Sequence, residues 1–427
     1  MSYLTFGVHY LKIAKRGGGK MNDLVPSIRK DLEFFPFQHQ GKQLILIRDH
    51  LGLVPEGKAI EIGLYRLMSL LDGTTTILDI QTGLMRQHGG TLVASDEVKK
   101  LLSHLDDSFL LDSERFKKAK DRIVEEFTSN RFRPCSHSGQ AYPENPVELS
   151  RKLDEIMGLS PSVPALEGKP VALVSPHIDI SVGRRGYACA YGCLKNASPA
   201  KVIVLGVGHH GFEGLFALTG KEFLTPLGNT KTENVSLEKL KDAGEGIIAP
   251  NDFAHKAEHS IEFQVIFLQH VLKKKPFKII PILCGSLLSA LREYGRSAYL
   301  EKAGPFLAVL SEIARDPETL MVTGVDFSHV GPKFGHPVPA RHLDSHSEAH
   351  DRSLLQHLVS LDAEAFWEES KRVNDQYNVC GFAALACLLE VLPPAGGRIL
   401  HYETWHEEAT GSAVSFAAVV FAEQKER

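Results

Sequence analysis

The stretch VALVSPHIDI at Val171–Ile180 decides the fold. An apolar, β-branched run ends there at Ser-Pro, and His177 follows directly. Continuous apolar runs of this length are typical of strands that are covered on both faces, as in parallel α/β sheets. The stretch therefore predicts a buried parallel strand with a histidine just beyond its carboxyl end.

The same pattern occurs twice more along the chain. KVIVLGVGHH at Lys201–His210 ends in two histidines, the first of which is His209, and TLMVTGVDFSH at Thr319–His329 runs into Asp326 and His329. One histidine at a strand end is usually a polar residue bonded to a neighbour. Three of them at one edge of a sheet, where ligands of α/β folds gather, favour a metal site, because imidazole is a common metal ligand.

The composition is that of a soluble globular protein. The chain has 427 residues, 43% of them hydrophobic and 23% charged, which leaves room for two or three domains. A net charge of −4 argues against a nucleic-acid partner. No apolar run approaches the roughly 20 residues of a membrane span. Six cysteines without a CxxC spacing favour a reducing compartment, so we expect a cytoplasmic location.

The chain is expected to begin with a disordered tail over residues 1–36. Met1–Lys20 lacks the apolar segment of a secretory signal, and Met21 is an alternative start. Residues 128–168 contain many prolines and predict a linker with one helix at Pro146–Met157. We expect the domains on either side of this linker to fold separately.

Residues 37–127 predict a small winged-helix-like α+β domain, and LLDGTTTILDIQTGL resembles PqqD-like peptide-chaperone domains. The helix expected over residues 77–87 carries Arg86 as its only cation, whereas contact with DNA normally needs several. A module that docks a peptide or protein is therefore favoured over a DNA reader. The expected elements are a strand at Gln43–Asp49, helices at Ile60–Leu71, 77–87 and Asp96–Leu105, a wing strand at Phe109–Asp112 and a charged helix at Phe116–Phe127.

Residues 169–427 predict an α/β domain with a mixed, mostly parallel sheet flanked by helices. The expected strands lie at 171–175, 201–206, 215–219, 278–283, 319–324, 398–403 and 413–421. The expected helices lie at about 185–196, 233–243, 260–273, 290–314, 345–357, 362–374 and 380–392.

Two further segments carry groups suited to chemistry. In EHSIEFQ, His259 and Glu262 are three residues apart and share a helix face, which suggests a pair for proton transfer or support of a metal ligand; Glu258 is explained by helix capping. Cys380 opens an apolar helix, where the helix dipole should lower its pKa, whereas Cys387 in the same helix is expected to be structural.

Two other pairs of possible metal ligands have ordinary explanations. His346 and His350 in the loop 331–350 have the i, i+4 spacing of metal ligands, but solvated histidines on a lid over the sheet edge are favoured. Cys135 and His137 form an isolated CxH in a polar loop, a pattern that usually has no function.

Five motifs in residues 169–421 resemble the Memo family, including the AmmeMemoRadiSam system protein B members: SPHID, VLGVGHH, EHSIEFQ, GVDFSHVG and NVCG. The resemblance implies a fold like that of class III extradiol dioxygenases. It implies metal binding by His177, His209 and His329, with Cys380 as the site cysteine and Asp326 and His259 beside it. The chain departs from the family at Asp179, where the family has a small glycine, and its first 165 residues lie outside the family pattern.

We therefore expect a non-haem redox protein that binds Fe(II) or Cu and acts on O2 or an unknown small-molecule substrate. His259, Asp326 and Cys380 are the candidate catalytic residues, and His177, His209, His329 and Cys380 the candidate metal ligands. The rival hypothesis is a non-catalytic adaptor whose residues 37–127 dock a peptide or a radical-SAM partner.

Overall fold

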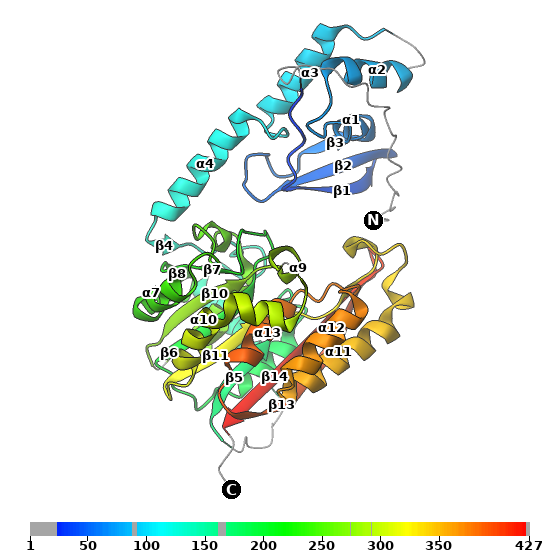
Figure 1. Ribbon diagram of the computed structural model, residues 1–427. Coiled ribbons are helices and arrows are strands. Elements are labelled where there is room, and N and C mark those ends of the chain that lie inside the picture. Colours follow the sequence, from blue (N-terminus) through cyan, green and yellow to red (C-terminus); the bar gives the residue numbers. More distant parts are fainter. Residues whose placement is uncertain (1–23, 88–91, 161–167, 274, 292, 424–427) are drawn as a thin grey trace. The chain divides into compact units, whose positions relative to one another are not determined.

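The computed structural model describes residues 24–87, 92–160, 168–273, 275–291 and 293–423 (Figure 1). The chain divides into two compact units, one ending at Glu126 and the other beginning at Phe127. Residues 1–23 of the expected tail lie outside the described residues. Within the described residues, no helix is both long enough and apolar enough to cross a membrane.

The first unit packs helices on a three-stranded antiparallel sheet of order β1-β2-β3. The turn between the first two strands is Gln40-Gly41, where both residues have positive φ, as tight hairpin turns require. Apolar side chains from the sheet and from three helices share one core. The elements are β1 (Leu32–His39), β2 (Lys42–Asp49), β3 (Ala59–Glu61), α1 (Ile62–Met68), α2 (Ile77–Gln87), α3 (Ser95–Asp107) and α4 (Glu114–Ser129).

The order of elements in this unit differs from the expected winged helix. The hairpin precedes the helices, and the expected wing strand at Phe109–Asp112 is reduced to a single bridge between Leu111 and Ile28. Part of the expected tail is also ordered. Arg29 is buried and forms an ion pair with Asp49 at 2.6 Å, so residues from 24 onward belong to this unit.

The second unit has an eight-stranded sheet of order β12-β14-β5-β11-β6-β10-β7, with β13 paired to β14. The four strands β5, β11, β6 and β10 are parallel neighbours, which confirms the predicted mixed, mostly parallel sheet. The strands of this unit are β4 (Phe132–Arg133), β5 (Pro170–Ser175), β6 (Lys201–Val207), β7 (Phe216–Leu218), β8 (Glu222–Thr225), β9 (Gly228–Thr230), β10 (Lys278–Cys284), β11 (Thr319–Gly324), β12 (His329–Val330), β13 (Ala395–Glu407) and β14 (Ser412–Glu423).

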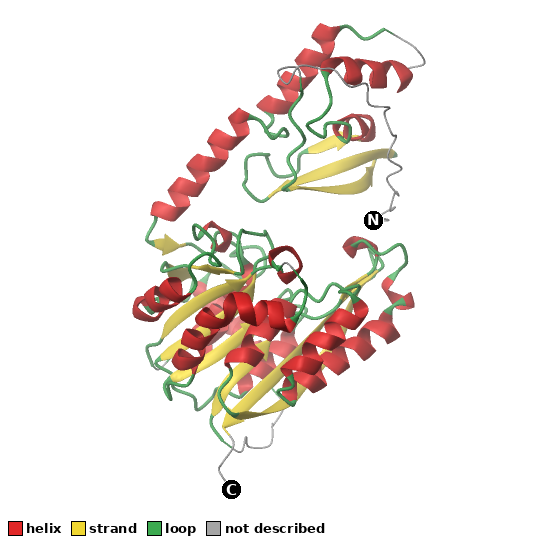
Figure 2. Cartoon of the chain, in the orientation of Figure 1, coloured by secondary structure: helices red, strands yellow, loops and turns green. Residues whose placement is uncertain are grey.

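Helices cover both faces of this sheet (Figure 2). One core contains residues of α5, α6 and α8, and the other contains residues of α7, α10, α11, α12 and α13. This coverage explains why the central strands are apolar along their whole length. The helices are α5 (Pro146–Met157), α6 (Arg184–Gly192), α7 (Asn234–Ala243), α8 (His259–Val271), α9 (Leu287–Ala290), α10 (Arg296–Ala314), α11 (Asp344–Val359), α12 (Ala363–Val373) and α13 (Phe382–Val391).

Residues 128–160 are not the expected linker, because they are built into the second unit. The helix expected at Pro146–Met157 is present as α5, and its apolar face, which includes Leu149 and Leu153, is fully buried in the core. Before it, Arg133 is completely buried and pairs with Glu262 of α8. Pro146 occupies the first turn of α5, where its missing N–H is tolerated.

Candidate metal centre

His177 lies just beyond β5, and its imidazole is held by a backbone carbonyl. The side chain is almost fully buried, and its Nδ1 lies 3.0 Å from the carbonyl oxygen of Gly324 at the end of β11. Because a carbonyl only accepts hydrogen bonds, Nδ1 carries the proton and Nε2 has a free lone pair. The sheet therefore presents the Nε2 of His177 as a ready metal ligand.

His209 lies just beyond β6 and is held by a carboxylate. Its Nδ1 lies 2.9 Å from Oε1 of Glu258, and its backbone N–H donates to Oε2 of the same residue at 3.0 Å. Glu258 is buried and also caps α8 by accepting the N–H of Ser260 at 2.9 Å. This carboxylate–histidine arrangement is the usual means of orienting a metal-binding imidazole, and it frees the Nε2 of His209.

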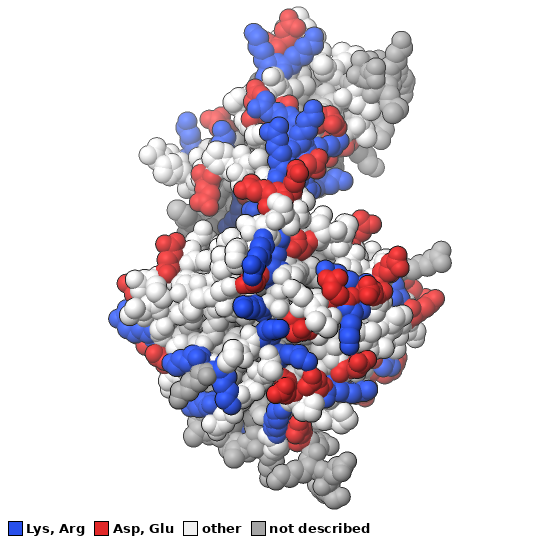
Figure 3. All heavy atoms as spheres, turned by 90° about the vertical axis from the view of Figure 1, so that its left-hand side faces the viewer, with Lys and Arg blue, Asp and Glu red and all other residues white. Residues whose placement is uncertain are grey.

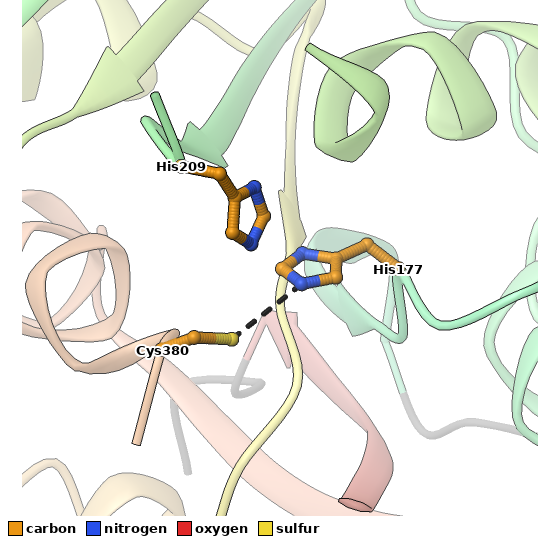
Figure 4. Close-up of side chains that lie close together, drawn as sticks. All are labelled: His177, His209 and Cys380. Carbon is orange, nitrogen blue, oxygen red and sulfur yellow. Dashed lines mark hydrogen bonds between the residues drawn. The ribbon is translucent and has the colours of Figure 1, made fainter. Parts of the chain in front are cut away.

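Cys380 precedes α13 and brings a thiol to the same place. Its Sγ lies 3.5 Å from the Nε2 of His177 and 3.6 Å from the carbonyl oxygen of Asp326. Figure 4 shows the side chains of His177, His209 and Cys380 converging from three separate segments. One ligand atom from each residue lies within 4.8 Å of the others, so the three can hold one ion.

Asp326 and His329 lie beside this group. Oδ1 of Asp326 accepts the N–H of His177 at 3.1 Å, and Oδ2 lies 3.6 Å from the Nε2 of His177. His329 points its Nδ1 at the carbonyl oxygen of Phe327, 2.9 Å away, and its ring meets Phe334 edge-on. The compact set of ligand atoms found among the described residues includes Cys380 and does not include His329.

His259 also reaches the site, but its expected partner does not. The ring of His259 stacks on that of His209 with centroids 4.8 Å apart, and lies 5.1 Å from that of His177. Glu262 turns away to Arg133, and it also accepts the hydroxyl of Tyr142 at 2.5 Å. The predicted His259–Glu262 pair is therefore wrong, and the carboxylate that serves the site is Glu258.

Burial controls the protonation of these groups. Desolvation and the neighbouring His209 lower the pKa of His177 to about 3. Burial is the largest effect on His209 and by itself lowers its pKa, but the charge and hydrogen bond of Glu258 and the charge of Asp326 together raise the pKa of His209. Burial raises the pKa of Asp326 to about 6. The imidazole of His177 is therefore neutral at physiological pH, and Asp326 can hold or release a proton near it.

The thiol of Cys380 behaves differently from the expectation. Its pKa is raised well above the usual value, first by burial and then by Asp326. α13 begins only at Phe382, with Gly381 as its cap. Cys380 therefore precedes the helix, and the helix dipole does not determine the pKa of its thiol. A bound cation would lower the pKa of the Cys380 thiol, because the thiolate is the form that binds metals.

The structure also places the other residues that the sequence analysis considered near a possible site. His346 is exposed, whereas His350 is buried against Glu369, with Nδ1 and Oε1 2.7 Å apart, so the two do not share an ion. Asp179 is exposed, and its carboxylate accepts the N–H of Ser181 at 2.7 Å within a turn. His137, for which the sequence predicts no function, lies against His259 with ring centroids 5.4 Å apart.

Comparisons with known proteins show which family the chain is similar to. A family model described as "Memo-like protein" matches residues 133–420. A MEMO1 family protein of Aquifex aeolicus is 31% identical over 400 residues, which cover 92% of this chain and all of the relative. A MEMO1 family protein of Thermus thermophilus is 27% identical, with 81% of this chain and 98% of the relative covered. The structure of an uncharacterized Escherichia coli K12 protein aligns with a TM-score of 0.36 at 13% identity, covering 58% of this chain and 98% of that one.

Proposed function

The chain belongs to the Memo family, and on this premise we propose that it is a metal-binding redox protein whose ion is held by His177, His209 and Cys380. The observation that carries the proposal is the convergence of three donor atoms within 4.8 Å of one another at the carboxyl edge of the sheet. The imidazoles of His177 and His209 are both oriented by partners on their Nδ1 atoms, as metal-binding histidines usually are.

The donor set fits copper or iron(II). Imidazole suits both metals, and a thiolate is a soft donor that favours Cu(I). When bound, such an ion supplies electron transfer to O2 or to a small-molecule substrate. Three protein ligands leave coordination positions open for that partner.

The surrounding side chains prepare the site for this chemistry. Glu258 and the carbonyl of Gly324 hold the two imidazoles in place, and the partly exposed His209 marks the open side. Asp326, with a pKa of about 6 and contact with His177, can take up or release a proton near neutral pH. Burial lowers the pKa of both His259 and His329, so both are further neutral imidazoles near the site.

The free cysteines and the surface charges support a proposal for the compartment and the partners. All six cysteines are free, which supports a reducing location such as the cytoplasm. On the face shown in Figure 3, basic and acidic side chains are interspersed, which does not favour nucleic acid.

An adaptor role is the alternative. The first unit has its own core, and β1 is an edge strand that pairs on one side with β2 and on the other with no strand among the described residues. Phe34, Phe35 and Phe37 are only partly buried along this strand. An extended peptide, for example from a radical-SAM partner, could add to such an edge. This alternative needs no stoichiometric metal.

Metal analysis separates the two functions. We expect protein purified without oxygen and supplied with Cu(I) or Fe(II) to retain one ion per chain. His177→Ala, His209→Ala and Cys380→Ser should lose it while remaining folded. His346→Ala and Cys135→Ser, which alter a histidine and a cysteine outside the set, should keep it. Wild-type protein that retains no ion, or site variants that retain it fully, would favour the adaptor.

A further inference from the structure

A second set of donor atoms adjoins the first at the start of α8. Glu258 and His259 lie next to each other there, and together with His209 they place one ligand atom each within 4.8 Å of the others. Oε1 of Glu258 lies 2.9 Å from the Nδ1 of His209 and 3.4 Å from the Nδ1 of His259. The two rings are stacked with an interplanar angle of 18°, so both imidazoles flank the same carboxylate.

The two sets meet at His209 but use different atoms of it. Nδ1 of His209 faces Glu258, which leaves Nε2 as the atom that His209 can offer to an ion at His177 and Cys380. A neutral imidazole offers a lone pair on only one nitrogen at a time. The two sets therefore compete for one ring, and the choice of its tautomer decides which set is complete.

The chemistry of the two sets differs. The first has two imidazoles and a thiol, which suits a soft ion such as Cu(I). The second has two imidazoles and a carboxylate, the donor combination of many non-haem Fe(II) sites, and its oxygen donor also suits Mn(II). Glu258 is buried and accepts the backbone N–H groups of His209 and Ser260, which favours its carboxylate form.

The backbone hydrogen bonds of Glu258 do not have to break for the second set to take an ion. Glu258 also accepts the backbone N–H groups of Ser260 and His209, and these two bonds can persist when a cation replaces the proton on the Nδ1 of His209. The His259 side chain is 27% exposed, which gives an ion access.

We propose that Glu258, His259 and the Nδ1 of His209 form a second metal site for a harder divalent ion such as Mn(II) or Fe(II), which excludes the ion at His177 and Cys380. When His209 changes ligand atom, its single proton moves from Nδ1 to Nε2, so no net proton is gained or lost on that ring. The competition between the two ions rests on the proposed function, because it requires an ion at His177 and Cys380. The second site itself does not, because its three ligands do not include Cys380.

Anaerobic titration with Mn(II), followed by the electron paramagnetic resonance signal of the free ion, tests the site. We expect wild-type protein to bind one Mn(II) per chain. His177→Ala and Cys380→Ser should keep this binding, whereas His259→Ala and Glu258→Gln should lose it. His259→Asn gives a second, milder loss if the alanine variant unfolds, and His346→Ala is the control. No Mn(II) binding to wild type, or equal loss in Cys380→Ser and His259→Ala, would overturn the second site.

Addition of Cu(I) tests the competition. One equivalent of Cu(I) should release Mn(II) from wild type but not from Cys380→Ser, whose soft set is incomplete. Simultaneous binding of both ions by wild type would refute the exclusion. Binding of Mn(II) without any binding of Cu(I) would leave the second site standing and contradict the proposed function instead.

Discussion

The Sγ of Cys380 lies 3.5 Å from the Nε2 of His177, although 203 residues separate them along the chain. Their contact arises because the carboxyl end of β5 and the start of α13 meet at one edge of the sheet. Neither segment alone indicates that a thiol and an imidazole would face each other. The contact between Cys380 and His177 therefore depends on the tertiary structure.

The burial of Cys380 predicts its reactivity. Because desolvation and Asp326 raise its pKa, little thiolate is present at neutral pH without metal. We expect metal-free Cys380 to react with iodoacetamide more slowly than Cys135 at pH 7, and the difference to narrow as the pH rises. Mass-spectrometric mapping of the labelled peptides measures both rates. Faster labelling of Cys380 would favour the helix-dipole effect expected from its sequence position.

The fold of the second unit could be predicted well because its signals are local. The run VALVS at 171–175 is apolar throughout, so β5 could be located within one residue. The fold of the first unit is harder to predict from the sequence. LEFFPFQH of β1 contains Pro36, which weakens a strand signal, and only the two residues Gln40 and Gly41 separate it from β2. Edge strands tolerate proline, which explains how β1 forms nevertheless.

The candidate site could be predicted only in part. The positions of His177 and His209 follow from the rule that functional groups gather at the carboxyl ends of parallel strands. The role of Glu258 could not be predicted, because a glutamate before a helix has an adequate explanation as a cap. The partner of Glu262 could not be predicted either, since Arg133 lies in a segment with the composition of a linker.

Glu262 should be a major source of stability for the second unit. Its side chain and that of Arg133 are completely buried and paired. Loss of one partner of such a pair leaves a buried charge and typically costs about 3–5 kcal/mol. We expect Glu262→Gln to lower the free energy of unfolding in urea by about this amount. Glu238→Gln, in an exposed pair with Lys241, should change it by less than about 1 kcal/mol. If both variants change the free energy of unfolding by the same small amount, Glu262 is not a major source of stability.

Residues 127–164 should be required for the second unit to fold. They supply Arg133, Tyr142 and the buried face of α5. We expect a fragment of residues 127–427 to be soluble and to unfold cooperatively. A fragment of residues 165–427 should aggregate or bind a hydrophobic dye. Cooperative unfolding of the shorter fragment would show that the preceding segment is a linker after all.

His255 should contribute to acid sensitivity. Burial lowers its pKa to about 4 in the folded protein, and its Nε2 bonds to the carbonyl oxygen of Ala217. Below pH of about 6.5 the unfolded chain binds a proton that the folded chain does not, so stability falls as the pH drops from about 6.5 to about 4, by up to about 3 kcal/mol. Urea unfolding at pH 7 and pH 4.5 should show a smaller loss for His255→Gln than for wild type. His346→Gln, which alters an exposed histidine, should lose as much stability between pH 7 and pH 4.5 as wild type. If His255→Gln also loses as much stability as wild type, His255 is not the source of the acid sensitivity.

The central claim is that His177, His209 and Cys380 hold one ion together. X-ray absorption of protein loaded with one equivalent of Cu(I) under anaerobic conditions tests it most directly, because the spectrum reports the ligand atoms. We expect one sulfur and two imidazole nitrogens around copper in wild type, and loss of the sulfur in Cys380→Ser but not in Cys135→Ser. Copper without a sulfur ligand in wild type, or an unchanged spectrum in Cys380→Ser, would contradict the claim.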